Sequence, residues 1–244
     1  MNKDVLYDIE TLRTIDIPIV AQILVDSFET NPCYSLIFRS KEKRREGLFW
    51  LFKTNLHLLN NRESLTYVVR LKSTGAIIGT YSLVPPTGVK TRFADYSAIG
   101  ITKFIQQFGL NSLYRMLRLD NLNKRTLNKA IKCSTYWYLS MVVIKKEFRG
   151  TGIGSYAIRQ CLQNVKDSYP DVLTIGLTTQ LPENIIFYSK LGFEQIDEGE
   201  IPFFKDSYYN YTLKYQIDER EPNRPTARNP ISFTKPKASP WVRI

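Results

Sequence analysis

A short glycine-rich segment between a predicted strand and a predicted helix, Met141–Gly154, constrains this chain more than any other feature. Its first part, Val142–Ile144, is apolar and β-branched, which is typical of a buried strand. A charged turn follows, and after it come Gly150, Gly152 and Gly154. Apolar residues then recur at helical spacing. The segment therefore predicts a strand, a tight loop and a helix N-terminus, in that order.

Such a loop is a natural binding place for a phosphate group. The first N–H groups of a helix have no carbonyl partner, and the helix dipole adds partial positive charge there. Glycines let the backbone approach a ligand closely and adopt positive φ. The alternative is a sharp turn with no ligand, and glycine-rich turns alone do not decide between the two.

Length and composition favour a globular protein. The chain has 244 residues, 43% of them hydrophobic, which is enough to bury a sizeable core in one large domain or a domain with an insertion. No apolar run approaches the ~20 residues of a membrane span, and the N-terminal segment lacks the apolar core of a signal peptide. We therefore expect a cytoplasmic protein without a membrane partner.

The cysteines and the charge give weaker indications. Cys33, Cys133 and Cys161 have neither metal-type spacing nor an even count, so we expect free thiols and no metal site. The formal net charge of +11 would suit nucleic acid, an acidic protein surface or an anionic cofactor. Because the basic residues are spread along the chain, a solvated basic surface is the simpler interpretation, and we do not expect nucleic acid as a partner.

The first half of the chain predicts a strand, two helices, a hairpin and a helical insertion. Val5–Thr11 has strand character, and Asp16 with Pro18 predicts a capped amphipathic helix that ends at Asn31-Pro32. The further predicted elements are a helix over Lys41–Asn60, strands over Leu65–Leu71 and Ala76–Leu83 with Gly75 in the turn, and helices within an insertion over Thr87–Ser134.

The second half predicts two parallel strands joined by a helix. Tyr136–Ile144 is expected to be the central strand, Gly152–Asp167 the helix, and Asp171–Thr178 a buried strand parallel to the first. A short helix over Pro182–Lys190 and two antiparallel strands, over Glu194–Ile196 and Tyr208–Gln216, follow. We therefore expect one domain over residues 1–216, with the insertion at about 87–134, and a proline-rich basic tail over 217–244 that is either loose or held against the domain.

A second motif follows the glycine loop about 30 residues later. The two motifs read Arg149-x-x-Gly152-x-Gly154 and Asn184-x-x-Phe187-Tyr188-x-x-x-Gly192-Phe193. In this order they resemble the pyrophosphate-binding motif and the short-helix motif of the GNAT superfamily of acyl-CoA-dependent N-acetyltransferases. The resemblance extends more loosely over about residues 4–216. It implies an α/β (α+β) fold: a mixed central sheet with splayed central strands, flanking helices, and a helical insertion before the central strand.

The resemblance also implies acetyl-CoA as cosubstrate. Backbone N–H groups from Gly150 to Ser155 would bind its pyrophosphate, and Arg149 would add charge or shape the loop. Free backbone groups of the central strand would bind the pantetheine arm like an added strand, and Asn184 would touch the pantetheine or adenosine region. The expected acetyl-CoA-binding residues are Val142, Val143, Ile144, Arg149, Gly150, Thr151, Gly152, Ile153, Gly154, Ser155, Asn184 and Tyr188.

Tyr188 is the candidate catalytic residue. In the family that the chain resembles, a tyrosine at this place reaches the CoA sulfur and protonates the leaving thiolate. A phenol with a pKa near ~10 suits that role. The alternative is an aromatic ring that only packs against CoA.

The sequence leaves several candidates for the general base. Many members of the family carry a glutamate on the central strand or its neighbour, whereas Tyr136–Val143 has no carboxylate. The base could be a water molecule held by Ser140, Tyr138 or a backbone carbonyl. It could also be a carboxylate of the insertion, such as Asp95 or Asp120.

The acceptor and the activity follow from the resemblance only in outline. The segment Asn31–Lys41 and the insertion are expected to form the acceptor pocket, with Tyr34, Phe38, Phe93 and Tyr96 as aromatic candidates that core packing also explains. The expected activity is direct transfer of acetyl from acetyl-CoA to an amine of a small molecule or peptide, by a monomer or homodimer. The alternatives are a non-catalytic acyl-CoA-binding module, and a basic nucleic-acid-associated protein that binds through its charge.

Overall fold

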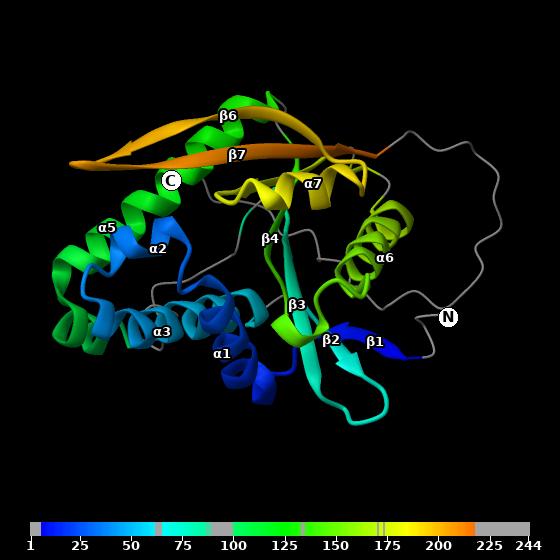
Figure 1. The fold of residues 1–244 in the computed structure, drawn as a ribbon, viewed down its shortest axis with the longest axis horizontal. Coiled ribbons are helices and arrows are strands. Elements are labelled where there is room, and N and C mark those ends of the chain that lie inside the picture. Colours follow the sequence, from blue (N-terminus) through cyan, green and yellow to red (C-terminus); the bar gives the residue numbers. More distant parts are fainter. Residues whose placement is uncertain are drawn as a thin grey trace, which may run out of the picture.

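A mixed sheet of seven strands forms the centre of the part of the chain that the computed structural model describes, residues 6–61, 65–86, 88, 100–132, 135–169, 171–172 and 174–217 (Figure 1). The strand order is β1-β2-β3-β4-β5-β7-β6, and only β4 and β5 run parallel. The strands are β1 (Tyr7–Thr11), β2 (Thr66–Leu71), β3 (Ile77–Val84), β4 (Trp137–Ile144), β5 (Thr174–Thr179), β6 (Glu194–Phe203) and β7 (Asp206–Gln216).

Two groups of helices cover the two faces of the sheet (Figure 1). One group packs on the first face and consists of α1 (Ile17–Phe28), α2 (Pro32–Ile37), α3 (Lys41–Asn60) and α5 (Ile101–Ile131). The other group consists of α6 (Ile153–Ser168) and α7 (Glu183–Ser189). A short 3₁₀ helix, η2 (Thr14–Asp16), precedes α1, and a second one, η3 (Lys146–Phe148), follows β4.

Neighbouring residues of one strand contribute to two separate hydrophobic cores, one on each face of the sheet. Val68 and Ile77 belong to the core beneath α1 and α3, whereas Val69 and Ile78 belong to the core beneath α6. Side chains of a strand alternate between the two faces of the sheet, so a strand that is covered on both sides must be apolar throughout. This explains why β2 and β3 are buried over most of their length.

The predicted fold class is confirmed, and most predicted elements are present. The helix over Lys41–Asn60 and the hairpin that turns at Gly75, with φ of +70°, match the structure closely. The strand, helix and parallel strand that surround the glycine loop are present as β4, α6 and β5. These elements carry strong periodic patterns or a turn glycine, so local chemistry identifies them.

The segment after α1 contains a helix, α2, that the sequence analysis does not predict. Asn31-Pro32 ends one helix and also begins the next, α2. The side-chain Oδ1 of Asn31 accepts a hydrogen bond from the backbone N–H of Cys33 (3.0 Å), and Pro32 occupies the first turn. An amide cap followed by proline is a strong start for a helix, and here it outweighs the stop signal.

Two further elements differ from the predictions. The insertion contains one long helix, α5, in place of several short ones, although Gly109 (φ +81°, ψ 158°) kinks it. β6 extends to Phe203, well beyond the predicted Glu194–Ile196. The prediction was too short because β6 is an exposed edge strand with several acidic residues, so its sequence lacks the apolar alternation that identifies a strand.

Several predictions fall on other parts of the chain. Phe93, Asp95, Tyr96, Cys133 and the proline-rich tail beyond Ile217 lie outside the described residues. Within the described ranges, no helix combines the length and the apolar character that crossing a bilayer requires.

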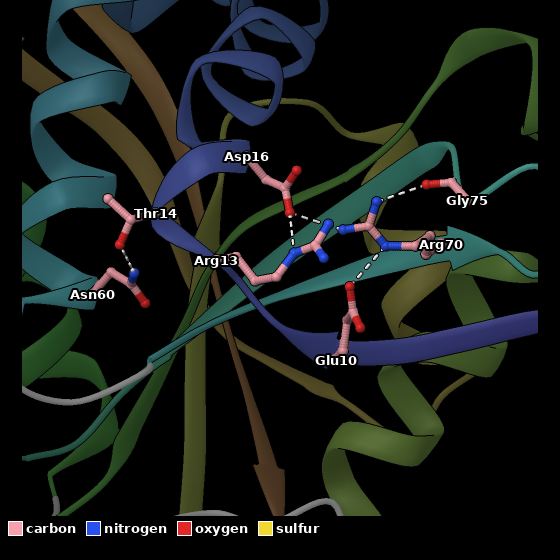
Figure 2. Close-up of polar contacts among 7 residues, drawn as sticks. All are labelled: Glu10, Arg13, Thr14, Asp16, Asn60, Arg70 and Gly75. Carbon is pink, nitrogen blue, oxygen red and sulfur yellow. Dashed lines mark hydrogen bonds and ion pairs between the residues drawn. The ribbon is translucent and has the colours of Figure 1, made fainter.

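Asp16, predicted as the cap of α1, pairs with arginines and makes no side-chain capping bond (Figure 2). One of its carboxylate oxygens, Oδ2, accepts from Arg13 Nε (2.7 Å) and from Arg70 Nη2 (2.9 Å). Arg70 also donates from Nε to Glu10 (2.7 Å) and from Nη1 to the carbonyl of Gly75 (2.6 Å). The network ties β1, the start of α1 and the β2–β3 turn together.

The charge state of Asp16 contributes to this network. Burial alone would raise the pKa of its carboxyl group, but the hydrogen bonds and ion pairs with Arg13 and Arg70 have the larger combined effect. The pKa of Asp16 is therefore lower than its ordinary value. Because the folded pKa is depressed, the pairs stabilise the folded protein above the unfolded pKa and lose that effect as the pH falls through the folded pKa.

We expect Asp16→Asn to lower the free energy of unfolding at pH 7 by roughly 2 kcal/mol, because charge-assisted bonds to two arginines are lost. The variant should also lose less stability than the wild type between pH 7 and about pH 3, since it lacks the carboxyl group that becomes protonated there. Denaturant unfolding at the two pH values measures both effects.

Asp8→Asn on β1 is the matched control. The Asp8 carboxylate lies 3.2 Å from Lys72 Nζ, but its side chain is 56% exposed, so the expected loss is below about 0.5 kcal/mol. Equal losses for the two variants would contradict the role given to Asp16.

Candidate active site

β4 and β5 pair at their N-terminal ends and then separate. Their backbone pairing ends at Tyr138 and Gly176, although both strands continue. Beyond that point β4 stays paired with β3, and β5 with β7, so each strand is held from its outer side. We call the separated stretches, residues 139–144 of β4 and 177–179 of β5, the splay. It confirms the splayed central strands that the sequence resemblance implied.

β4 is distorted within the splay. Its register against β3 shifts there, and Met141 has φ of +50°, which is uncommon for a non-glycine residue. A bulge of this kind changes the direction of the backbone groups that follow it, here those of Val142–Ile144. Val143 packs in the core beneath α1, whereas Val142 and Ile144 pack on the opposite face. No local sequence signal marks this bulge.

The glycine loop leads from the end of β4 to α6. Gly150 and Gly152 have φ of +76° and +77°, so both adopt the left-handed conformation that glycine tolerates. The first helical bond runs from the N–H of Tyr156 to the carbonyl of Gly152 (3.0 Å), and no side chain caps this end of α6. The N–H groups of residues 153–155 therefore point out of the helix end, as a phosphate site requires.

Arg149 and Thr151 hold the loop in shape. Arg149 donates from Nε to the carbonyl of Ile144 (2.9 Å) and from Nη2 to Ser27 Oγ on α1 (3.3 Å). Thr151 Oγ1 donates to the carbonyl of Phe148 (2.7 Å). Of the two roles considered for Arg149, this geometry favours shaping the loop, while the guanidinium charge stays next to it.

Asn184 is bonded to the end of β5. Its Nδ2 donates to Thr179 Oγ1 (2.8 Å), and the same hydroxyl accepts from the N–H of Leu181 (3.3 Å). These bonds start α7 and hold it beside the splay. Contact of Asn184 with a cofactor stays a prediction, and its bond to Thr179 is a structural role that sequence reasoning did not find.

The two sequence motifs meet at Gly154. A Cβ atom at this position would lie 3.4 Å from Cζ of Phe187 on α7 and 3.5 Å from Cγ1 of Ile144 on β4. The side chains of Ser155 and Ile153 flank this point on α6, where Ile153 is buried. Residues far apart in the sequence thus come together at the start of α6.

Tyr188 lies on α7 with 7% of its surface exposed. Its ring packs edge-on against Phe187 and Phe193, with centroids 5.0 and 5.5 Å away. Burial, with a smaller effect from Tyr138, raises the pKa of Tyr188, so the phenol is protonated at neutral pH. Within the described part of the chain, its hydroxyl makes no hydrogen bond. It is therefore a proton donor without a fixed partner.

Tyr138 stands where the two strands separate. Its hydroxyl lies 3.3 Å from Thr178 Oγ1, so one side-chain contact bridges β4 and β5 just beyond their last backbone pairing. Burial raises the pKa of Tyr138, and the pKa values of Tyr34 on α2 and Tyr208 on β7 are also raised, mainly by burial and in part by Tyr138. Tyrosines from α2, α7 and β7 therefore each lie within electrostatic reach of Tyr138 on β4.

The sequence identified only part of this tyrosine cluster. Tyr34 had been considered for the acceptor pocket, whereas Tyr208 had not, because only the β6–β7 hairpin brings it next to α5. There its hydroxyl donates to Asn123 Oδ1 (2.7 Å). Phe38, also considered for the pocket, is 3% exposed and packs edge-on against Phe104 and Phe108 in the core. Core packing is therefore the correct interpretation of Phe38.

The possible bases differ in their surroundings. Ser140 pairs with Ser82 across the β3–β4 ladder within the splay. Asp120 on α5 is exposed, accepts from Lys124 Nζ (2.7 Å), and contributes to the raised pKa of Tyr138. Among the described residues, no group of three His, Cys, Asp or Glu side chains is placed to bind a metal ion.

The parallel central strands thus separate next to a glycine loop and the N-terminus of α6. Residues 121–195, which include β4, the loop, α6, β5 and α7, match the family model of the acetyltransferase (GNAT) domain. Residues 121–195 of this chain are therefore similar to a GNAT acetyltransferase domain.

Solved structures support the same fold. One from Corynebacterium glutamicum, described as histone acetyltransferase HPA2 and related acetyltransferase, has a TM-score of 0.56 and 19% identity over 91% of this chain and 99% of that chain. Arylalkylamine N-acetyltransferase 2 from Aedes aegypti has a TM-score of 0.52 and 13% identity over 87% and 99%. A polyamine N-acetyltransferase from Drosophila melanogaster has a TM-score of 0.51 and 9% identity over 86% and 100%. No curated protein matches the sequence.

Gly79→Ala should destabilise the protein by about 1–3 kcal/mol, because β3 approaches β4 too closely at this point for a side chain. An added Cβ would lie 2.4 Å from Cδ1 of Ile144 and 2.8 Å from the backbone oxygen of Val143. Denaturant unfolding measures the loss. Gly199→Ala on β6 is the control, since a Cβ there meets no atom within 4 Å; similar stabilities for both variants would be inconsistent with the close approach.

Proposed function

We propose that this protein transfers an acetyl group from acetyl-CoA directly to the amine of a small molecule or peptide. The main support for the proposal is the splay. It leaves residues 139–144 of β4 without a strand partner on the side of β5, so an extended ligand could pair with them. The glycine loop and the N-terminus of α6 begin where these residues end. Two of the similar structures carry names of enzymes that acetylate amines, an arylalkylamine N-acetyltransferase and a polyamine N-acetyltransferase.

The residues at this place fit acetyl-CoA. The uncapped N-terminus of α6 and the left-handed Gly150 and Gly152 offer backbone N–H groups to a pyrophosphate. The space around a Cβ at Gly150 is open to 4 Å, so the backbone is accessible there. The backbone of Val142–Ile144 would hold the pantetheine arm as an added strand. In this proposal the remaining contacts come from Arg149, Thr151, Ile153, Gly154, Ser155, Asn184 and Tyr188.

Acetyl-CoA supplies an acyl group activated as a thioester. A backbone N–H in the distorted part of β4 polarises the carbonyl oxygen, and a preorganised donor of this kind contributes roughly 3 kcal/mol to transition-state stabilisation. As the C–N bond forms and the C–S bond breaks, Tyr188 donates its phenolic proton to the departing thiolate. Its raised pKa keeps that proton available at neutral and mildly alkaline pH.

The amine must lose a proton to react. We propose that a water molecule near Tyr138 and Ser140 accepts it, because both side chains lie at the splay and β4 carries no carboxylate. Asp120 is the second candidate, since its charge reaches Tyr138.

Buried thiols make a covalent acetyl-enzyme a poor alternative. Burial raises the pKa of both Cys33 and Cys161, the latter to about 12, so each is a thiol and not a thiolate at neutral pH. The thiolate is the nucleophilic form. Direct transfer from acetyl-CoA to the amine, within one complex of enzyme and both substrates, needs no such nucleophile.

A thiol-release assay with acetyl-CoA and a panel of amines tests this proposal, with Tyr188→Phe as the key variant. We expect the wild type to release CoA with at least one amine, and the variant to lose about 100-fold in kcat, because general acid catalysis is worth at least that much. Its affinity for acetyl-CoA should change little.

Tyr7→Phe on the distant edge strand β1 is the control and should keep full turnover. An unchanged kcat in Tyr188→Phe would leave Tyr188 as a packing residue only. If the wild type bound CoA but acetylated no amine of the panel, the non-catalytic binding module would replace the enzyme.

Gly150→Ala compared with Gly75→Ala tests the loop as the pyrophosphate site. Both glycines have positive φ, +76° and +70°, and open space around the added Cβ, so both variants should lose about 1 kcal/mol of stability from backbone strain. Only Gly150→Ala should also weaken CoA binding, by roughly 10-fold or more, because its methyl group and distorted backbone oppose close approach of the phosphates. Isothermal titration with CoA measures the affinities, and equal affinities would contradict this site.

A further inference from the structure

Three consecutive residues at the end of β5 each bond a different element of the candidate site. Thr178 Oγ1 lies 3.3 Å from the hydroxyl of Tyr138 on β4, and Thr179 Oγ1 accepts from Asn184 on α7 (2.8 Å). Gln180, the residue after the strand, uses both ends of its side-chain amide, towards α2 and towards β7. The end of β5 therefore connects both walls of the splay with the helix that carries Tyr34.

The amide of Gln180 is the centre of a continuous chain of hydrogen bonds. Its Oε1 accepts from Asn31 Nδ2 (3.1 Å), and its Nε2 donates to Asn210 Oδ1 (2.9 Å). Asn31 in turn caps α2, because its Oδ1 accepts from the N–H of Cys33 (3.0 Å). At the other end, Asn210 Nδ2 donates to Thr212 Oγ1 (3.4 Å). We call Asn31, Gln180 and Asn210 the amide relay.

Two of the three relay residues are buried, so the loss of a relay hydrogen bond should be costly. Asn31 is 6% exposed and Asn210 only 1% exposed, so water cannot replace a lost partner without rearrangement. A buried polar group that loses its partner is costly, whereas a fully paired chain of amides holds its members in one geometry. The relay therefore favours a single placement of α2 relative to the ends of β5 and β7.

The element that the relay places, α2, carries Tyr34, which packs on the face of the sheet that α1 and α3 cover. Tyr34 lies two residues after the start of α2, and it packs against the same core as Val143 of the splay. The ring of Tyr34 also packs edge-on against Phe28 and Phe52, with centroids 6.0 and 5.4 Å away. The aromatic contacts hold the ring, while the relay holds the backbone from which it projects.

We propose that Gln180 is a positioning residue that sets α2, and with it Tyr34, against the splay, and so determines the affinity for the amine acceptor. The proposal rests on the acetyltransfer function proposed above. α2 lies on the side of the sheet opposite to α6 and α7 (Figure 1), and in this proposal the amine lies on the side of α2, away from the glycine loop.

Gln180→Met removes both relay bonds at similar side-chain length. With an amine that the wild type acetylates, KM for the amine should rise by roughly 10-fold, since two buried amides lose a partner. The kcat at saturating amine and the Kd for acetyl-CoA should stay within about 2-fold of the wild type, because Gln180 touches neither the loop nor Tyr188.

Asn31→Ser is the second variant, because it separates the relay from the helix cap. A serine hydroxyl still caps a helix well but is too short to reach Gln180. It should raise KM for the amine in the same way as Gln180→Met. Gln22→Met is the matched control: Gln22 is an exposed amide on α1 that bonds Asp26 (2.9 Å), and its loss should change neither parameter.

Amide hydrogen exchange supplies a readout that does not depend on turnover. Both relay variants should exchange the amides of residues 33–37 faster than the wild type by about 10-fold, with the amides of α3 unchanged. Unchanged exchange in α2 would overturn the positioning role, as would a fall in kcat with no change in KM. If the wild type acetylates no amine but exchange in α2 still rises in the variants, the proposed function fails while the structural part of this inference stands.

Discussion

The early end of the pairing between β4 and β5 is the constraint on which the rest of the structure depends. Backbone groups that lose a partner inside a protein cost roughly 1–3 kcal/mol each, so a fold does not separate two central strands without compensation. Here β3 and β7 hold the two strands from outside, and the Tyr138–Thr178 contact joins them just past the last backbone pair. The unpaired side of β4 is thus available to an extended ligand, and the glycine loop lies at its end.

The side chains around the splay are mainly neutral hydrogen-bonding groups. Tyr34, Tyr138, Tyr188 and Tyr208 are phenols whose pKa values are raised by burial, and the amide relay adds further uncharged groups. A neutral phenol can donate a proton to a thiolate, whereas a strong local charge would change that balance. Ion pairs stabilise the fold at another place, in the Asp16 network that joins β1, α1 and the β2–β3 turn.

Much of the fold could be predicted because its elements carry local signals. The helix at Lys41–Asn60 begins at a Ser40 cap, the hairpin turns at Gly75, and the glycine loop follows an apolar strand. The predictions failed where one segment carries both a helix-stop and a helix-start signal, and where polar residues obscure the alternation of a strand. Asn31-Pro32 both ends a helix and starts one, and the acidic residues of β6 conceal an exposed edge strand.

The sequence by itself determined the glycine loop, the parallel strands around it and the family to which the two motifs point, because each depends on residues within a few positions of one another. Only the tertiary structure decided that Tyr34 and Tyr208 pack in the same core, that Asn31, Gln180 and Asn210 form one relay, and that Asp16 pairs with Arg70 without capping α1. These contacts join residues that are far apart along the chain. Their geometry is set by how strands and helices pack, and no local pattern encodes it.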